Sequence, residues 1–202
     1  MPRHLHWFQN DGGPLLIIPE PAAPYWEGGD PPSNGRVVEA TFRYDTQIAT
    51  DYDRACDVND WVGALEIGPS WGVVLGNTTS ASAAWLAGPR AEQFYAVGVD
   101  ATDDDSSATL LTLATSQRNG AWRRVLTSAE VTARGLLLLH AASRGGEVQE
   151  QASDTPGTAL IGDGIRHAVP PGRFAVEACT VGMPQRTFVT FVRFTLSHDM
   201  AR

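Results

Sequence analysis

Lysine is absent from this chain, so arginine supplies all 15 basic residues, and the 23 acidic residues leave a net charge of −8. Contacts to nucleic-acid phosphates need a basic face, so this balance argues against a nucleic-acid partner. It is compatible with a basic protein partner, whose approach an acidic surface accelerates. The same charge can also serve solubility alone.

Cysteine is scarce, since Cys56 and Cys179 are the only two. They are too few for a disulfide framework, and neither lies in a C-x-x-C or zinc-ligand spacing. We therefore expect both to be small buried residues of a protein in a reducing compartment.

Long apolar runs are missing as well. The run at residues 15–18 is bounded by Pro14 and Pro19, and it is too short for a signal peptide or a membrane span. The sequence therefore predicts a cytoplasmic protein with no membrane association. Its apolar content of 43% and charged content of 19% are typical of a folded globular chain.

The stretch 51–76 is expected to organise the fold. Residues 61–67 and 71–76 are apolar runs, and Gly68, Pro69 and Ser70 between them favour a chain reversal, so a β-hairpin is predicted. The preceding segment, residues 51–56, has the spacing of one helical turn or of a loop that packs on the hairpin.

Alternation of apolar and polar residues and well-marked turns predict most of the other elements as strands. These strands are expected at residues 5–9, 14–18, 37–44, 93–99, 122–126, 131–142, 158–161, 164–169, 173–181 and 187–197, with a turn or helical start at 127–130.

One main helix is predicted near residues 106–118. Ser107, Leu110, Leu111 and Ala114 recur at helical spacing. The three aspartates at 103–105 precede this pattern, where acidic residues cap a helix more often than they hold a metal.

The predicted fold class is therefore α+β and β-rich, with antiparallel hairpins and meanders in two halves. No linker rich in proline and serine separates the halves. One domain over residues 1–202 is expected, with 1–100 and 101–202 as two β-rich subdomains in the alternative.

No motif of a known reaction centre is present, and no cofactor is predicted. His4 and His6 would point the same way on a strand, but no third ligand lies near them in sequence, so no metal is predicted either. His140 is expected to be a partly buried, hydrogen-bonded imidazole.

Asp51 and Asp53 form an acid pair that would face one way in an extended segment, as general acid and base residues do. Arg54 lies beside them, and we expect it to hold them ionised. An ion-paired structural corner or a binding patch therefore fits these residues better than proton transfer.

Several pieces of the sequence together carry a family resemblance. They are Trp7 followed by Gly12-Gly13-Pro14, Trp26-x-Gly28-Gly29, Asp51-Tyr52-x-Arg54-Ala55-Cys56, residues 72–76 and Pro170-Pro171-Gly172-Arg173-Phe174. With these pieces the chain resembles the immunity protein 21 family of bacterial polymorphic toxin systems over nearly its whole length. The segment at 51–56 is the most specific piece, and Phe174 stands where the pattern favours tyrosine.

The resemblance implies a cytoplasmic protein, encoded beside a toxin, that protects the producing cell by binding that toxin. It carries over no catalytic residue. We therefore expect an acidic and aromatic surface to cover the active site of a basic toxin. The candidate contact residues, each also explicable as a core or turn residue, are Tyr25, Trp26, Asp51, Asp53, Trp71 and Trp85.

Two alternatives remain open from the sequence. One is a hydrolase whose site combines distant residues such as Asp51 and His140. The other is a sensor of small molecules or carbohydrates that uses exposed tryptophans as stacking surfaces. The toxin, the interface and the oligomeric state are not predicted.

Overall fold

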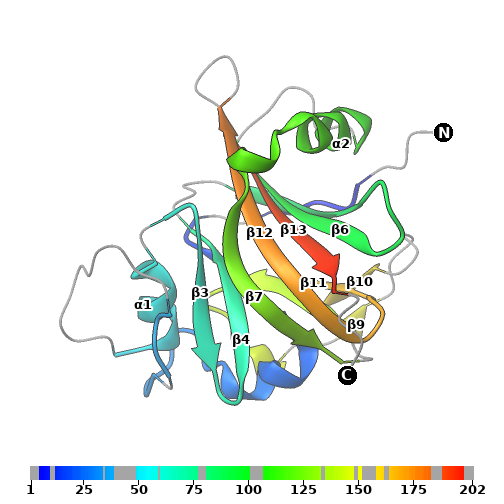
Figure 1. The fold of residues 1–202 in the computed structure, drawn as a ribbon. Helices are drawn as coiled ribbons and strands as arrows, with labels where there is room; N and C mark the ends of the chain where they lie inside the picture. The colour runs from blue at the N-terminus through cyan, green and yellow to red at the C-terminus, as the bar shows by residue number, and fades with distance from the viewer. Residues whose placement is uncertain are drawn as a thin grey trace.

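The structure, a computed structural model, describes residues 5–9, 12–33, 35–38, 49–58, 60–76, 81–100, 107–132, 135–147, 150–151, 158–161, 164–182 and 188–197. Two antiparallel sheets pack face to face, and helices cover part of each outer face (Figure 1). No helix within these ranges is long and apolar enough to cross a bilayer.

The first sheet has the order β1-β5-β6-β13-β12-β7. Its strands are β1 (Phe8–Gln9), β5 (Ala81–Ala87), β6 (Gln93–Asp100), β13 (Phe188–Leu196), β12 (Gly172–Gly182) and β7 (Arg123–Val131). The outer face of this sheet is covered at one end by α2 (Ser107–Ser116), which continues into the short helix η2 (Asn119–Ala121).

The second sheet has the order β3-β4-β2-β8-β11-β10-β9. Its strands are β3 (Val62–Ile67), β4 (Ser70–Leu75), β2 (Leu15–Pro19), β8 (Leu136–His140), β11 (Gly164–His167), β10 (Thr158–Ile161) and β9 (Glu150–Gln151). Three short helices accompany it, namely η1 (Glu20–Tyr25), α1 (Asp51–Cys56) and η3 (Gly145–Glu147). Each sheet takes strands from both halves of the sequence, so the halves 1–100 and 101–202 do not correspond to the two sheets.

The main core lies between the sheets. It includes Leu15, Ile17, Leu136, Leu138 and Ile165 from the second sheet and Phe94, Phe174, Val176, Val192 and Phe194 from the first. The rings of Phe94 and Phe194 stack with centroids 4.9 Å apart.

Strand β2 and the four leucines of β8 form continuous apolar runs, and both faces of these runs are buried. Their alternate residues, such as Leu16 and Leu137, point away from the main core and pack under η1 and α1 with Trp26 and Ala55. On the other side of the molecule, Leu110 and Ala114 of α2 pack on the outer face of the first sheet. Burial on both faces explains why continuous apolar runs appear in a chain with otherwise alternating strands.

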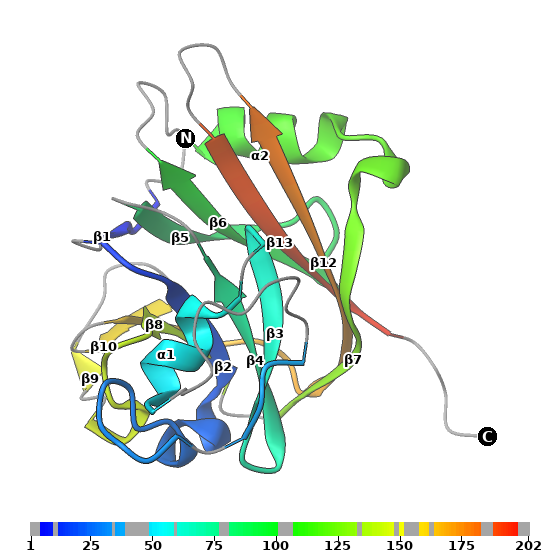
Figure 2. The same cartoon turned by 90° about the vertical axis from the view of Figure 1, so that its left-hand side faces the viewer.

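Several predictions from the sequence are confirmed. The chain is β-rich, α1 follows the predicted segment 51–56, and β3 and β4 form the predicted hairpin. The main helix lies at Ser107–Ser116, and Asn119 begins the short helix that follows it. Figure 2 shows α1 and the β3–β4 hairpin together on the side that faces the viewer.

The predicted turn at 127–130 is wrong, because β7 runs through these residues. The pairing of β7 with β12 shifts register on both sides of Val176, which pairs with Leu126. The serine and threonine that suggested a turn therefore lie at a β-bulge within a strand.

The predicted strand 131–142 is also wrong as a single element. Strand β7 ends at Val131 in the first sheet, and β8 begins at Leu136 in the second. Gly135 lies between them with a φ of +95°, a conformation that glycine adopts without the strain of a Cβ. The chain changes sheets at this point.

Two further expectations have different outcomes. Cys56 is exposed, contrary to prediction, because it is the last residue of α1 on the side away from the sheet, whereas Cys179 is buried. Of the predicted strand 37–44, Val37 forms an isolated bridge with Leu65. Residues 39–48, His4 and the aspartates at 103–105 lie outside the described residues.

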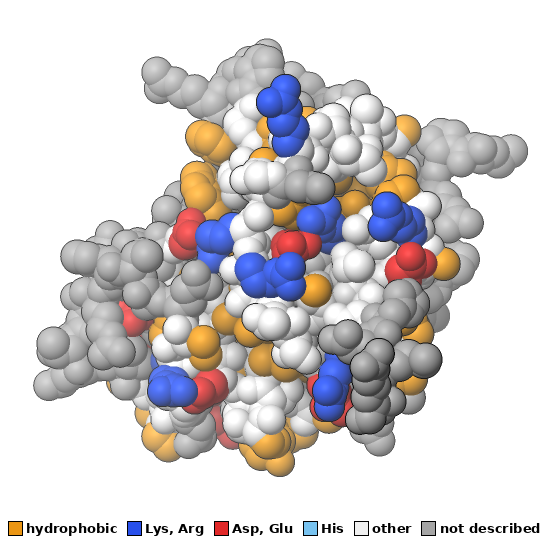
Figure 3. Space-filling model, viewed as in Figure 1, with side chains coloured by type: hydrophobic (Ala, Val, Ile, Leu, Met, Phe, Trp, Pro, Cys, Tyr) orange, Lys and Arg blue, Asp and Glu red, His pale blue; other side chains and the backbone are white. Residues whose placement is uncertain are grey.

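The outer face of the first sheet carries charges of both signs. In Figure 3, which views this face, most basic side chains lie beside an acidic one, and the basic side chain at the top has no acidic neighbour in view. The carboxylate of Glu177, for example, contacts Arg124 at 3.1 Å and Arg193 at 2.7 Å. One carboxylate between two guanidinium groups leaves a local excess of positive charge at this point of the face.

Candidate functional site

Helix α1 begins at a capping box. Thr50 has an extended backbone, and its hydroxyl oxygen accepts a hydrogen bond of 3.1 Å from the backbone N–H of Asp53. The Asp53 carboxylate accepts in return from the backbone N–H of Thr50 at 2.9 Å. This reciprocal pair satisfies two backbone donors and starts a helix in a segment too short to be stable alone.

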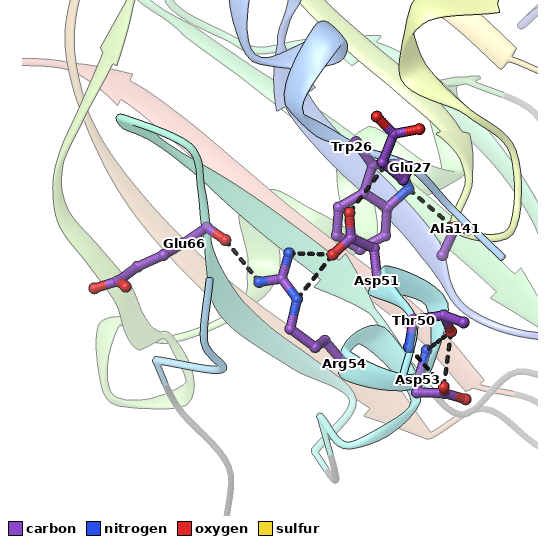
Figure 4. Close-up of polar contacts among 8 residues, drawn as sticks. All are labelled: Trp26, Glu27, Thr50, Asp51, Asp53, Arg54, Glu66 and Ala141. Atoms are coloured by element: carbon purple, nitrogen blue, oxygen red, sulfur yellow. Dashed lines mark hydrogen bonds and ion pairs between the residues drawn. The ribbon is translucent and has the colours of Figure 1, made fainter. Parts of the chain in front are cut away.

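Asp51 and Arg54 form a buried ion pair on the inner side of α1 (Figure 4). Their side chains are 0% and 1% exposed, and Arg54 donates two hydrogen bonds to one carboxylate oxygen at 2.7 and 3.1 Å. The other Asp51 oxygen accepts from the backbone N–H of Glu27 at 2.9 Å. Arg54 donates a third bond, of 2.8 Å, to the backbone carbonyl of Glu66 in β3.

Trp26 completes this corner. Its indole N–H donates to the carbonyl of Ala141 at 2.9 Å, and the Arg54 guanidinium lies 5.4 Å from its ring centroid. Helix α1 is thus tied to η1, to β3 and to the segment after β8. The prediction of an ion-paired structural corner at Asp51 and Arg54 is confirmed.

The groups of the hydrolase alternative are engaged in structural contacts. The N–H of Ala142 donates to Nδ1 of His140, so the ring proton is on Nε2 and is donated to the carbonyl of Gly12 at 2.8 Å. The hydrogen-bonded imidazole predicted from the sequence is confirmed. Asp51 is held by Arg54 and by the backbone of Glu27, and both ring nitrogens of His140 are in the hydrogen bonds just described. In this structure, both side chains are therefore engaged in structural contacts rather than placed for proton transfer.

No group of three or more histidine, cysteine or acidic side chains within the described ranges is placed to hold a metal ion.

The candidate contact residues fall into two groups. Trp26, Asp51 and Trp85 are buried, with 1%, 0% and 7% of each residue exposed. Tyr25 is 47% exposed, and Asp53 and Trp71 are partly exposed. Trp71, on β4, donates its indole N–H to the carbonyl of Glu130 in β7. Tyr25 and Asp53 therefore remain as surface residues near α1.

The sequence predicted an acidic surface but not the acidic residues that gather around Arg144. The Arg144 guanidinium is shared by the carboxylates of Glu27, Asp30 and Glu147, at 3.6 Å to Glu27 and 3.4 Å to Glu147. These carboxylates, Asp30 foremost, raise the pKa of Arg144. Three exposed carboxylates around one cation leave an excess of negative charge, and we call Glu27, Asp30 and Glu147 the acidic surface.

Backbone contacts between distant segments build this surface. The N–H of Gly29 donates to the carbonyl of Ala142, and the N–H of Gly145 donates to the carbonyl of Trp26, each at 3.0 Å. Gly28 has a φ of +61°, and a Cβ there would lie 2.3 Å from the Ala142 oxygen. The two segments are more than 110 residues apart in sequence, so no local pattern could reveal their meeting.

Taken together, these observations define a class of protein: a two-sheet β-sandwich with helices on both outer faces and an ion-paired corner that supports an acidic surface. The family model for immunity protein 21 matches residues 6–187, and the chain therefore belongs to the immunity protein 21 family. The resemblance noted in the sequence is confirmed. Comparison with curated proteins and with solved structures gave no match.

His167 occupies an apolar site at the other end of the sandwich. Its ring stacks on Trp85 with centroids 5.0 Å apart and lies 5.3 Å from the ring of Phe94. Its Nδ1 is enclosed and has no hydrogen-bond partner among the described residues. Burial lowers the pKa of His167 from 6.5 to about 4.

This pKa predicts acid sensitivity. Between pH 6.5 and about 4 the unfolded chain binds a proton that the folded chain excludes, so stability falls as the pH drops through this window. From pH 7.5 to pH 4.5 the loss due to His167 should be about 2–3 kcal/mol. Urea unfolding measures the free energy of unfolding at both pH values. In the variant His167→Phe, this free energy should fall between the two pH values by less than in the wild type, and the two falls should differ by that amount. If the free energy of unfolding falls equally in the variant and in the wild type, the lowered pKa assigned to His167 is contradicted.

Proposed function

We propose that this protein is an immunity protein that binds a cognate toxin and blocks it without transforming it. The observation that carries the proposal is the family match over residues 6–187. The structural engagement of Asp51 and His140 supports the absence of chemistry, because these were the residues that the sequence offered for a reaction centre.

The acidic surface and Tyr25 support one mode of binding. Its carboxylates are exposed and would attract a basic toxin. The exposed ring of Tyr25 rests on Gly68 at the β3–β4 turn, where a Cβ would lie 2.5 Å from the ring. An aromatic side chain held in place before binding loses little conformational freedom when a partner covers it. We propose that the toxin docks here and that its active site is covered.

The function is tested by co-expression. The product of the neighbouring gene should be toxic alone, and it should be tolerated and co-purify with this protein when both are made. Failure of both rescue and co-purification would contradict the proposed function.

Removing charge from the acidic surface should slow association. Glu27→Gln combined with Glu147→Gln leaves Asp30 to pair with Arg144 and removes two negative charges. We expect the association rate with the toxin to fall about five- to tenfold at low salt and much less at 0.5 M salt. Stopped-flow fluorescence measures this rate.

The matched control is Glu92→Gln combined with Glu130→Gln, which makes the same change of net charge beside the first sheet. Its association rate should stay within twofold of the wild type. Equal slowing by both double variants would show that net charge, and not this surface, steers the toxin.

A further inference from the structure

Most edges of the two sheets are protected against pairing with another chain. The edge of β3 is covered by residues 36–38, since Val38 N–H donates to the carbonyl of Ala64 and Glu66 N–H donates to that of Arg36. Strands β1 and β9 are edges of two residues each. Strand β7 carries a β-bulge and the charged residues Arg123, Arg124 and Glu130. Short length, bulges and charges all disfavour the addition of a strand.

The end of β12 lacks these protections. Residues 179–182 pair with β13 without interruption as far as Gly182 and Phe188, but pairing with β7 stops at Ala178 and Arg123. In the part of the chain that the structure describes, no strand pairs with the other edge of these four residues. None of the four is charged or a proline. Their backbone groups on this edge are suited to pair with an extended chain.

A pocket of about 190 Å³ adjoins this edge, and its lining combines apolar side chains, such as Trp61, Val62 and Ala178, with the polar side chains of Asp60, Arg123 and Thr180. At its rim Asp60 and Arg123 form an ion pair of 3.1 Å, and Arg123 also donates to the carbonyl of Val62. Both rim charges have partners, so the pocket favours an apolar group. Sites for small ligands usually measure about 300–1,000 Å³, which makes this pocket better suited to a single side chain.

The pocket is formed in the absence of a partner. The ring of Trp61 lies 5.0 Å from that of Phe188 at the start of β13, so this wall is held by the first sheet. Strand β3 and helix α1 lie on the side that faces the viewer in Figure 2, and Asp60 and Trp61 connect them. The pocket lies between this connecting segment and the end of β12, so a partner that pairs with β12 can reach it.

From the open edge and the pocket we infer that an extended segment of the toxin pairs with residues 179–182 as an added strand and inserts one apolar side chain against Trp61. The inference rests on the proposed function, and it names the binding mode. Backbone pairing would supply affinity, and the pocket would select the side chain.

Two measurements test this inference with the purified, catalytically inactivated product of the neighbouring gene as the probe. In Ala121→Trp the new ring occupies the pocket from an exposed position, and the Kd should rise at least tenfold. The control Ala91→Trp, also exposed but in the β5–β6 turn, should stay within twofold of the wild type. In the wild-type complex, backbone amides of 179–182 should exchange with deuterium more slowly than in the free protein.

The inference is overturned if the complex forms and residues 179–182 exchange as in the free protein. It is equally overturned if Ala121→Trp, with an unchanged Tm, binds as the wild type does. The proposed function stands in both cases, because the complex has formed. Absence of any complex with the wild type contradicts the proposed function itself.

Discussion

Replacing Arg54 by methionine should lower the free energy of unfolding by about 3–5 kcal/mol, because it leaves the Asp51 carboxylate buried without its partner. Asp51 would keep the backbone N–H of Glu27 but lose both hydrogen bonds from the guanidinium. The carbonyl of Glu66 would lose the donor that Arg54 provides. Urea denaturation followed by tryptophan fluorescence measures the change.

Arg36 provides the matched control, because its guanidinium, like that of Arg54, contacts Glu66 of β3. Its guanidinium lies 2.8 Å from the carboxylate of Glu66, but its side chain is 76% exposed. Exposed ion pairs contribute little, so Arg36→Met should change stability by no more than about 0.5 kcal/mol. A similar loss in the Arg36 and Arg54 variants would refute the role given to the buried pair.

Trp26→Ala should cost about 3–5 kcal/mol, as for other large-to-small changes of buried aromatic residues. The indole is 1% exposed, and its N–H satisfies the carbonyl of Ala141. The neighbouring Tyr25 is largely solvent-exposed, and Tyr25→Ala should cost less than about 1 kcal/mol. Thermal and urea unfolding of both variants provide the comparison.

The two substitutions should also separate stability from binding. At a temperature where Trp26→Ala is folded, we expect its affinity for the toxin to stay near that of the wild type, because the indole is enclosed. Tyr25→Ala should weaken binding while leaving the fold stable. A direct loss of affinity in folded Trp26→Ala, with Tyr25→Ala unaffected, would place the contact surface elsewhere.

Local signals in the sequence were sufficient for the elements around α1. Gly68 and Pro69 mark the hairpin turn, and the residue types at 51–56 suit one short helix. The presence of Arg54 beside two aspartates predicted an ion-paired corner, which the buried pair with Asp51 confirms. These features depend on residues that are close in the chain.

The order of the strands depends on partners that are distant in sequence. Leu16 pairs with Val74 on one side and with Leu139 on the other. No local pattern specifies these neighbours. The same limitation explains why the sequence did not show which residues form the acidic surface, where Glu27 and Glu147 meet only because distant segments pack together.

Residue type alone also did not show which aromatic side chains are buried. Tyr25 and Trp26 are adjacent in a segment rich in proline and glycine, yet one is 47% and the other 1% exposed. The end of η1 directs their side chains to opposite sides, and only packing against the second sheet decides which is enclosed. A turn signal at 127–130 similarly marked a β-bulge, because long-range pairing with β12 determines the local structure.

The central claim is that this protein acts by occupying a toxin rather than by altering it, and titration of toxin activity tests this claim most directly. Increasing amounts of this protein are added to a fixed amount of active toxin, and the residual activity is followed over hours. Stoichiometric binding predicts a linear fall that reaches zero at about one equivalent and does not deepen with time. Complete loss of toxin activity at a small fraction of an equivalent, progressing with time, would show turnover and contradict the claim.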